Sequence, residues 1–242
     1  MQVNNQEGAI RPRLNPANWN EKYQRGEYAM SHEKMMAELQ LAVLGDVIPL
    51  SIKIDTASYQ NEIARFDGDW CDYLPRTDRF NNRKGLTVTT FPGLTHKETP
   101  SLAELANRFN RPIKEIEMCE PTEVYHHCTS LHPILNLFPN LGRTFILKCN
   151  MGGYFVPHRD HPQLDRDVFR VLVFLKNCGR NQFDFIFDNQ CLEIEEGRAY
   201  VINTRKTHRA FSFIDDSQQM VLNVPMTLEN TLTILSNLQH RH

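Results

Sequence analysis

The sequence has no long hydrophobic run, no Cys-x-x-Cys pair and no excess of either charge. No hydrophobic stretch approaches the roughly 20 residues of a membrane-spanning helix, so we expect no membrane partner. The six cysteines are scattered, which argues against a zinc ribbon or a redox pair and favours a reduced, cytoplasmic protein. The 27 basic and 29 acidic residues give no indication of nucleic-acid binding. The polar N-terminus lacks the hydrophobic segment of a signal peptide.

The hydrophobic content of 40% in 242 residues is sufficient for one sizeable core, so we predict a single domain over residues 1–242. Residues 1–140 are expected to form an N-terminal arm, helices and outer strands. Residues 141–226 are expected to form a β core that holds the functional site, and residues 227–242 a C-terminal helix or tail. In the first part, capping residues and hydrophobic spacing predict helices over 31–44, 55–66 and 101–108, and one or two short helices broken near Pro133.

The second part reads as a series of short strands separated by turn residues. Hydrophobic, β-branched and aromatic residues predict strands over 143–150, 168–176, 183–187, 191–194, 198–203, 209–214 and 220–225. Many short strands at close spacing are typical of barrels and sandwiches. We therefore predict a mainly β fold with flanking helices that cover one sheet from outside.

The most informative motif is a His-x-Asp pair, His158 and Asp160, which is followed much later in the chain by a third candidate ligand, His208. Side chains two residues apart in an extended segment project to the same side. His208 stands at the start of an expected strand, which is where a third ligand from a neighbouring strand would come from. Two imidazoles and one carboxylate are the ligand set of non-haem iron oxygenases, which leave the opposite face of the metal open. We therefore predict an Fe(II) site.

Two other interpretations of this motif remain. His161 follows Asp160 directly and competes as a ligand, but an adjacent residue in an extended segment points to the opposite face. We expect His161 to lie behind the ligands or beside the substrate. Alternatively, His158 and Asp160 form a solvated pair in a loop, and His208 is an ordinary surface residue.

The order of Tyr154, His158, Asp160, Arg170, Gly197 and His208 resembles that of the 2-oxoglutarate- and Fe(II)-dependent dioxygenase superfamily. The strand around Arg170 is similar to the one after the first histidine in the aspartyl/asparaginyl β-hydroxylase and bacterial proline hydroxylase branch. The resemblance covers residues 143–225, roughly the predicted β core. It implies a double-stranded β-helix, a cupin-like jelly roll, with iron at one mouth. It also implies 2-oxoglutarate as cosubstrate, O2 as oxidant and ascorbate as reductant.

The cosubstrate has a far carboxylate that requires a cation. Many members of the superfamily place Arg or Lys about ten positions after the second histidine, since these side chains bind a carboxylate well. This chain has Ser217, Gln218 and Gln219 there. We expect Arg170 to take this role, because a guanidinium that interrupts a hydrophobic strand needs an anionic partner. A salt bridge with Asp184 or Asp188 is the structural alternative.

Further candidates for cosubstrate binding are Arg209, Tyr154 and Asn223. Lys148 and Asn150 share a face of the strand before the Gly-Gly turn, and we expect them to line the pocket as well. By resemblance, the expected reaction is hydroxylation of an amino acid, free or in a peptide, so the expected partner is a small-molecule or peptide substrate. Arg159, His161 and Arg166 are candidates for binding a carboxylate of that substrate. The sequence does not indicate an oligomeric state.

Two alternative functions stay open. One is a cupin-like metal enzyme that does not use 2-oxoglutarate, although such sites usually carry a His-x-His pair and an additional acidic or amide ligand. The other is a non-catalytic β-barrel that binds a ligand or partner. The lack of a cation at positions 217–219 favours the second alternative, whereas the intact ligand triad opposes it.

Overall fold

The computed structural model describes residues 32–73, 82–160 and 168–239, so the N-terminal arm expected over residues 1–28 lies outside the described residues. The helices in these ranges are α2 (His32–Leu44), α3 (Thr56–Ile63), α4 (Leu102–Phe109), α5 (Glu123–His127), α6 (His132–Leu135) and α7 (Leu228–Ser236). The strands are β1 (Val47–Lys53), β2 (Cys71–Asp72), β3 (Arg83–Thr90), β4 (Glu120–Pro121), β5 (Thr144–Cys149), β6 (Tyr154–His158), β7 (Val168–Lys176), β8 (Phe183–Phe187), β9 (Gln190–Cys191), β10 (Arg198–Ile202), β11 (His208–Ser212) and β12 (Ser217–Pro225).

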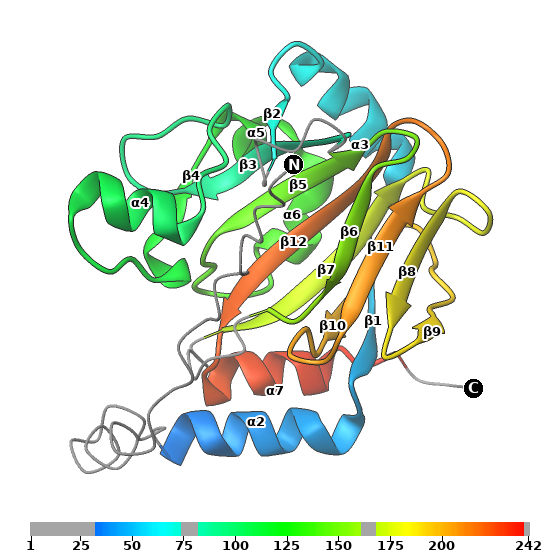
Figure 1. The fold of residues 1–242 in the computed structure, drawn as a ribbon. Coiled ribbons are helices and arrows are strands. Elements are labelled where there is room, and N and C mark those ends of the chain that lie inside the picture. The colour runs from blue at the N-terminus through cyan, green and yellow to red at the C-terminus, as the bar shows by residue number, and fades with distance from the viewer. Residues whose placement is uncertain (1–31, 74–81, 161–167, 240–242) are drawn as a thin grey trace, which may run out of the picture.

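The described strands form two sheets that face each other (Figure 1). The larger sheet has the order β1-β10-β7-β12-β5-β3-β2, with β4 beside β3, and the smaller sheet has the order β6-β11-β8-β9. From β5 to β12 the chain alternates between them, because β5, β7, β10 and β12 lie in the larger sheet, and β6, β8, β9 and β11 in the smaller one. All of these pairings are antiparallel. This winding defines the double-stranded β-helix that the resemblance implied.

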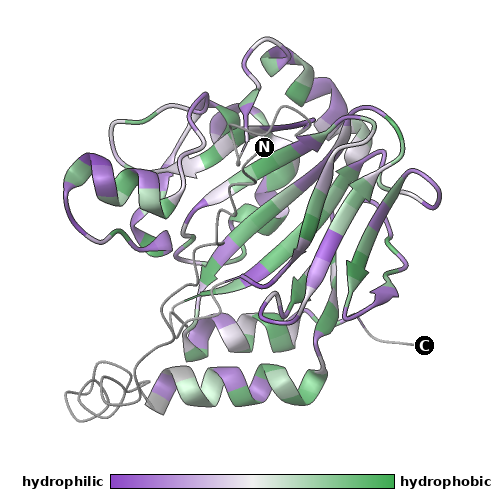
Figure 2. Cartoon of the chain, viewed as in Figure 1, coloured by the Kyte–Doolittle hydropathy of each residue, from purple (hydrophilic) through white to green (hydrophobic). Residues whose placement is uncertain are grey.

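A hydrophobic core fills the space between the two sheets. Alternate residues of β5, β7 and β12 point inward, among them Phe145, Leu172 and Val221. They pack against aromatic residues of the smaller sheet, including Phe183 and Phe185. Both faces of the larger sheet are therefore buried, which explains why its strands are mostly hydrophobic (Figure 2).

The opposite face of the larger sheet is covered by helices, as the sequence predicts. Tyr59 and Ile63 of α3 belong to the same buried cluster as Val171 and Val173 of β7. At the other end of the sheet, α2 and α7 lie side by side (Figure 1). The helices therefore support the larger sheet from outside and leave the space between the sheets to the functional site.

Local sequence signals account for most element boundaries. Asp55 accepts hydrogen bonds from the backbone of the first turn of α3, and Ser101 and Glu104 form the predicted capping box of α4. The short helices expected to break near Pro133 are α5 and α6, and Pro133 lies in the first turn of α6, where a missing backbone N–H costs nothing. The strand expected over 191–194 needs correction, because within it only Cys191 pairs with β8, as part of β9 (Gln190–Cys191).

A tight turn at Gly152 and Gly153 carries the chain from β5 in the larger sheet to β6 in the smaller one. Gly152 has a φ of 78°, which side chains other than glycine rarely tolerate. A Cβ atom at Gly153 would lie 2.8 Å from the carbonyl oxygen of Asn150. The two glycines thus permit the reversal that brings β6 beside β11. None of the helices in the described residues is both long and apolar enough to cross a membrane.

Candidate metal centre

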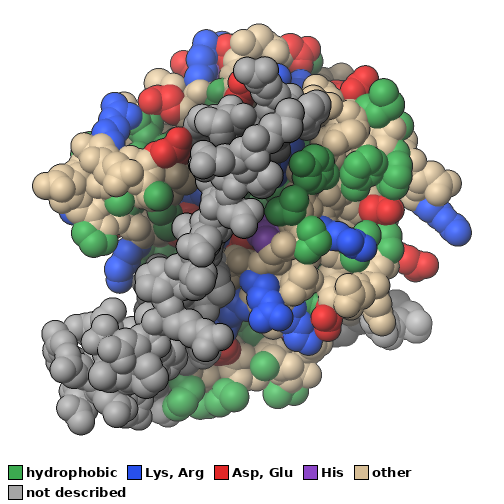
Figure 3. All heavy atoms as spheres, in the orientation of Figure 1, with side chains coloured by type: hydrophobic (Ala, Val, Ile, Leu, Met, Phe, Trp, Pro, Cys, Tyr) green, Lys and Arg blue, Asp and Glu red, His purple; other side chains and the backbone are tan. Residues whose placement is uncertain are grey.

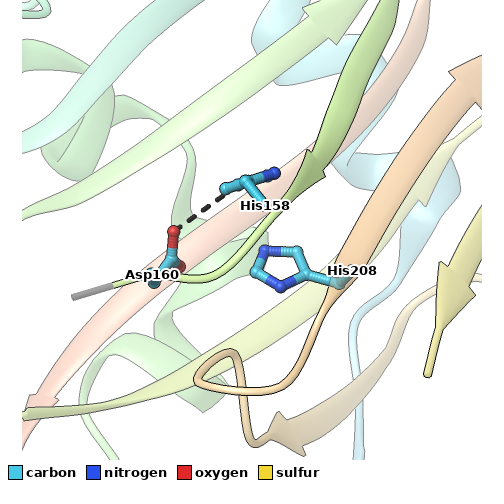
Figure 4. Close-up of side chains that lie close together, drawn as sticks. All are labelled: His158, Asp160 and His208. Atoms are coloured by element: carbon cyan, nitrogen blue, oxygen red, sulfur yellow. Dashed lines mark ion pairs between the residues drawn. The ribbon is translucent and has the colours of Figure 1, made fainter. Parts of the chain in front are cut away.

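Three side chains from two distant parts of the sequence meet at one mouth of the space between the sheets (Figure 4). His158 ends β6, Asp160 lies two residues further on, and His208 begins β11. β6 and β11 pair so that His158 and His208 are direct neighbours, with ring centroids 4.2 Å apart. One candidate ligand atom from each of the three residues lies within 4.8 Å of the others. The three residues therefore form a candidate metal-binding group.

Both imidazole rings are held in the same way, by the backbone carbonyl group two residues earlier in the chain. Nδ1 of His158 lies 2.7 Å from the carbonyl oxygen of Val156, and Nδ1 of His208 lies 3.0 Å from that of Lys206. A carbonyl oxygen only accepts hydrogen bonds, so each Nδ1 carries the proton and each Nε2 presents a lone pair. This arrangement fixes the tautomer and the ring orientation that a metal-binding histidine needs.

The electrostatic surroundings favour the protonation states of metal ligands in two of the three residues. Burial tends to raise the pKa of Asp160, but Arg170 and the two histidines outweigh it and hold the pKa well below its ordinary value. Burial lowers the pKa of His208, which keeps that ring neutral at pH 7. The pKa of His158 is raised, chiefly by its contact with Asp160, whose Oδ1 lies 3.6 Å from Nε2. A metal ion that binds His158 therefore has to displace a proton that is held more tightly than in an ordinary histidine.

Asp160 is held in place from two sides. Its backbone N–H donates to the carbonyl oxygen of Thr204, at 2.9 Å, and its Oδ2 lies 2.7 Å from Nε of Arg170. The Arg170 side chain is buried, on β7 of the larger sheet. Because Arg170 engages Oδ2, Oδ1 is the oxygen that faces His158. Arg170 thus orients the carboxylate toward the two imidazoles.

Arg170 belongs to a buried polar network at this mouth. Its Nη1 donates to Oδ1 of Asn223, at 2.6 Å, and its Nη2 lies 3.8 Å from Oε1 of Glu115. Asn223 in turn donates to Oε2 of Glu115, at 3.3 Å, and to the carbonyl oxygen of Arg143, at 2.6 Å. The acids that pair with Arg170 are therefore Asp160 and Glu115, not Asp184 or Asp188. The predicted role of Arg170 in cosubstrate binding stays a prediction.

A hollow opens beside the three side chains and extends between the sheets. It holds about 570 Å³ of empty space, part of it open to solvent, which is in the size range of small-molecule sites. Half of its lining residues are hydrophobic or aromatic, among them Phe145, Phe155, Leu172, Phe185 and Val221. On the face seen in Figure 3, a histidine surface is visible near the centre, with Lys and Arg side chains below it. The candidate ligands therefore border a cavity of suitable size for a small ligand.

The charged residues that line the hollow are mainly cationic. They comprise three arginines, Arg143, Arg170 and Arg209, and one carboxylate, Asp160. A divalent ion at the three candidate ligands would add to this positive charge. The hollow is therefore better suited to an anionic ligand than to a neutral or cationic one.

The other residues predicted to bind the cosubstrate are more dispersed. Arg209 is exposed and borders the hollow, whereas Tyr154 is half-buried and does not line it. The expectation that Lys148 and Asn150 line it is corrected by the alternation of β5, whose inward residues are Phe145 and Leu147. The Lys148 ammonium lies 4.5 Å from the ring centroid of Trp70, on the opposite face of the sheet. The Asn150 side chain accepts a hydrogen bond from the backbone N–H of Asp216, at 3.4 Å.

Of the three residues predicted to bind a substrate carboxylate, only Arg159 falls within the described ranges. It is exposed, and its Nε donates to Oγ1 of Thr207, at 3.2 Å. His161 and Arg166 lie outside the described residues.

Sequence reasoning missed two buried charged residues at this mouth, Glu115 and Arg143. Glu115 begins a short 3-10 helix, Glu115–Glu117, and nothing in the sequence distinguishes it from surface acids. Arg143 did carry a signal. It stands two residues before Phe145 and four before Leu147, on the face of β5 that points into the hollow, and that alternation places it at the mouth.

No protein-family model matches the chain, and no curated protein matches it in sequence. Among solved structures, the chain is similar to an oxidoreductase of the 2OG-Fe(II) oxygenase family from Burkholderia pseudomallei, with a TM-score of 0.42 and 12% identity over 81% of this chain and 92% of that one. It is also similar to a Pseudomonas putida prolyl-4-hydroxylase, with a TM-score of 0.44 and 11% identity over 78% and 99% of the two chains. A third is a prolyl hydroxylase from Trichoplax adhaerens in complex with a peptide fragment of the hypoxia inducible factor oxygen degradation domain, with a TM-score of 0.46 and 10% identity over 86% and 94%. The function of this chain has to be inferred from its own site.

Proposed function

We propose that this protein is an Fe(II)- and 2-oxoglutarate-dependent dioxygenase that hydroxylates an amino acid, free or in a peptide. The observation that carries the proposal is the meeting of His158, Asp160 and His208 at the mouth of the double-stranded β-helix. The two imidazole Nε2 atoms and one carboxylate form the donor set that suits ferrous iron in oxygenases. The adjoining hollow leaves space for a chelating ligand on the remaining side.

The donor set fits an iron ion in its chemistry as well as in its position. His158 and His208 supply neutral imidazoles with their protons on Nδ1, and Asp160 supplies an ionised carboxylate. When bound, iron with 2-oxoglutarate and O2 supplies the oxidising power for hydroxylation, with succinate and CO2 as co-products.

The residues around the donor set have roles that do not depend on the identity of the substrate. Arg170 orients Asp160 and offsets its negative charge inside the protein. Phe155 and Phe185 form part of the apolar wall that limits the access of water to the site. The cationic lining attracts an acidic cosubstrate.

Product formation gives a direct test of this proposal. The purified full chain is supplied with Fe(II), 2-oxoglutarate, ascorbate and air, and succinate is measured across a panel of amino acids and peptides. We expect succinate formation that rises with one class of substrate and is lost in the H208A variant. Failure to form succinate with any member of a broad panel, in a preparation that binds Fe(II), would count against the proposal.

A second candidate is a cupin-like metal enzyme that does not use 2-oxoglutarate. The observation that favours it is the neutral inner part of the hollow, where Gln219 and Leu147 pair on adjacent strands. Gln219 lies on β12 further from the mouth than Asn223 does, and Leu147 lies beside it on β5. The same assay separates the two candidates, because only a 2-oxoglutarate-dependent enzyme releases succinate.

A further inference from the structure

Besides Nε of Arg170, which forms an ion pair with Asp160, two polar atoms in the wall of the hollow lack a hydrogen-bond partner among the described residues. They are Nη2 of Arg143 and Oε1 of Gln219. Both side chains are more than nine-tenths buried. Buried polar groups are nearly always hydrogen-bonded, and an unpaired buried donor costs free energy. A guanidinium with an unpaired N–H at the wall of a cavity therefore points to a ligand with an acceptor group.

The position of the Arg143 guanidinium is fixed by its surroundings. The backbone N–H of Arg143 donates to the carbonyl oxygen of Glu115, at 2.9 Å, and its carbonyl oxygen accepts from the backbone of Asn223, at 3.1 Å. The guanidinium carbon lies 4.4 Å from the ring centroid of Phe145, so the side chain stacks on a pocket wall. A cation held in this way has little conformational freedom left to lose when it binds an anion.

The carboxylate beside Arg143 does not satisfy its guanidinium with a short hydrogen bond. Oε1 of Glu115 lies 3.8 Å from Nη1 of Arg143, beyond hydrogen-bond length, and at the same distance from Nη2 of Arg170. One carboxylate oxygen thus faces two guanidinium groups. The shared contact also places Arg143 in the same polar network as Arg170, which holds the candidate ligand Asp160.

We infer that Arg143 binds the far carboxylate of the 2-oxo acid that the metal chelates. This inference rests on the proposed function. Among the arginines that line the hollow, Arg170 already engages Asp160 and Asn223, and Arg209 is exposed. Arg143 is the buried one with an unpaired donor. It takes the place of the cation that the sequence lacks at positions 217–219.

Calorimetric binding to the Mn(II)-loaded full chain tests this inference without relying on turnover. The two ligands are 2-oxoglutarate and 2-oxopentanoate, which has the same chelating end but no far carboxylate. The variants are R143Q and the control R198Q, since Arg198 pairs with Glu195 and does not line the hollow. We expect R143Q to weaken 2-oxoglutarate binding on the order of 10- to 100-fold and to change 2-oxopentanoate binding less than about twofold, as for loss of a charge-assisted contact.

The outcomes separate this inference from the proposed function. Equal weakening of both ligands in R143Q means that Arg143 only positions the site, and unchanged binding of both means that another group holds the carboxylate. Either result overturns the inference. If the wild-type protein binds Mn(II) but neither ligand, the proposed function fails as well. Should R143Q not fold, R143K keeps the charge but loses the planar fork, and the same selective loss, smaller in size, is expected.

Discussion

Replacement of Arg170 by Met removes the central cation of the buried network. Arg170 contacts Oδ2 of Asp160 at 2.7 Å and Oδ1 of Asn223 at 2.6 Å, and its Nη2 lies 3.8 Å from Glu115. Without it, the Glu115 carboxylate, which is 5% exposed, loses one of the two guanidinium groups that lie 3.8 Å from its Oε1. Removing one partner from a buried ion pair costs about 3–5 kcal/mol. We expect R170M to lose about this much free energy of unfolding.

The same substitution is expected to weaken metal binding. Arg170 orients Asp160, and loss of a group that orients a metal ligand typically lowers affinity about 10- to 100-fold. Urea denaturation without metal measures the stability change, and titration with Mn(II) measures the affinity change. The matched control is R108M, because the Arg108 side chain is 58% exposed, pairs with Glu98 at the surface and does not line the hollow. We expect it to lose at most about 1 kcal/mol.

A double variant tests whether an uncompensated charge causes the loss. In R170M/E115Q no buried carboxylate of Glu115 is left without its cation, so part of the stability should return. The reasoning is refuted if R170M loses less than about 1 kcal/mol and binds Mn(II) like the wild type. It is also refuted if adding E115Q to R170M lowers stability further.

Three more predictions concern the fold. Phe174 is 1% exposed between the sheets, so F174A should cost about 3–5 kcal/mol of unfolding free energy in urea denaturation, and a loss below about 1 kcal/mol would contradict the packing. Burial alone would raise the pKa of Asp216, but the hydrogen bond from Lys176 outweighs burial and lowers that pKa below its ordinary value. The ionised Asp216 therefore stabilises the fold above the ordinary carboxyl pKa, and this stabilisation is lost as the pH falls through the lower pKa of the folded state. D216N should flatten the decline of the unfolding free energy at acid pH, and an unchanged pH profile would contradict this reasoning. A thiol reagent should label exposed Cys119 and Cys191 fastest in the folded protein, and the three buried cysteines only on unfolding; equal labelling rates would contradict the burial.

The sequence predicts the β core well because its strands either are buried on both faces or alternate between buried and more exposed residues. The strands 168–176 and 183–187 begin and end where hydrophobic residues begin and end. The three candidate metal ligands could be predicted because their spacing reflects backbone geometry directly. His158 and Asp160 follow from extended spacing, and His208 from its place at the start of a strand.

The network behind the candidate ligands could not be predicted in the same way. Glu115 reaches the mouth from a short 3-10 helix, and only the folded chain places it between Arg143 and Arg170. The partner of Arg170 was misjudged because pairing across sheets and loops leaves no periodic pattern. Lys148 was placed in the hollow because it is polar, but it lies on the face of β5 opposite to Phe145 and Leu147.

The central claim is that His158, Asp160 and His208 together bind one divalent metal ion, and metal binding by the full chain tests it most directly. Equilibrium dialysis against Mn(II) or anaerobic Fe(II) compares the wild type with H208A and with the control H126A, which alters an exposed histidine outside the cluster. We predict one ion per chain for the wild type and for H126A, and loss of that ion in H208A. A wild-type chain that binds no ion, or an H208A variant that binds it as tightly, would contradict the claim.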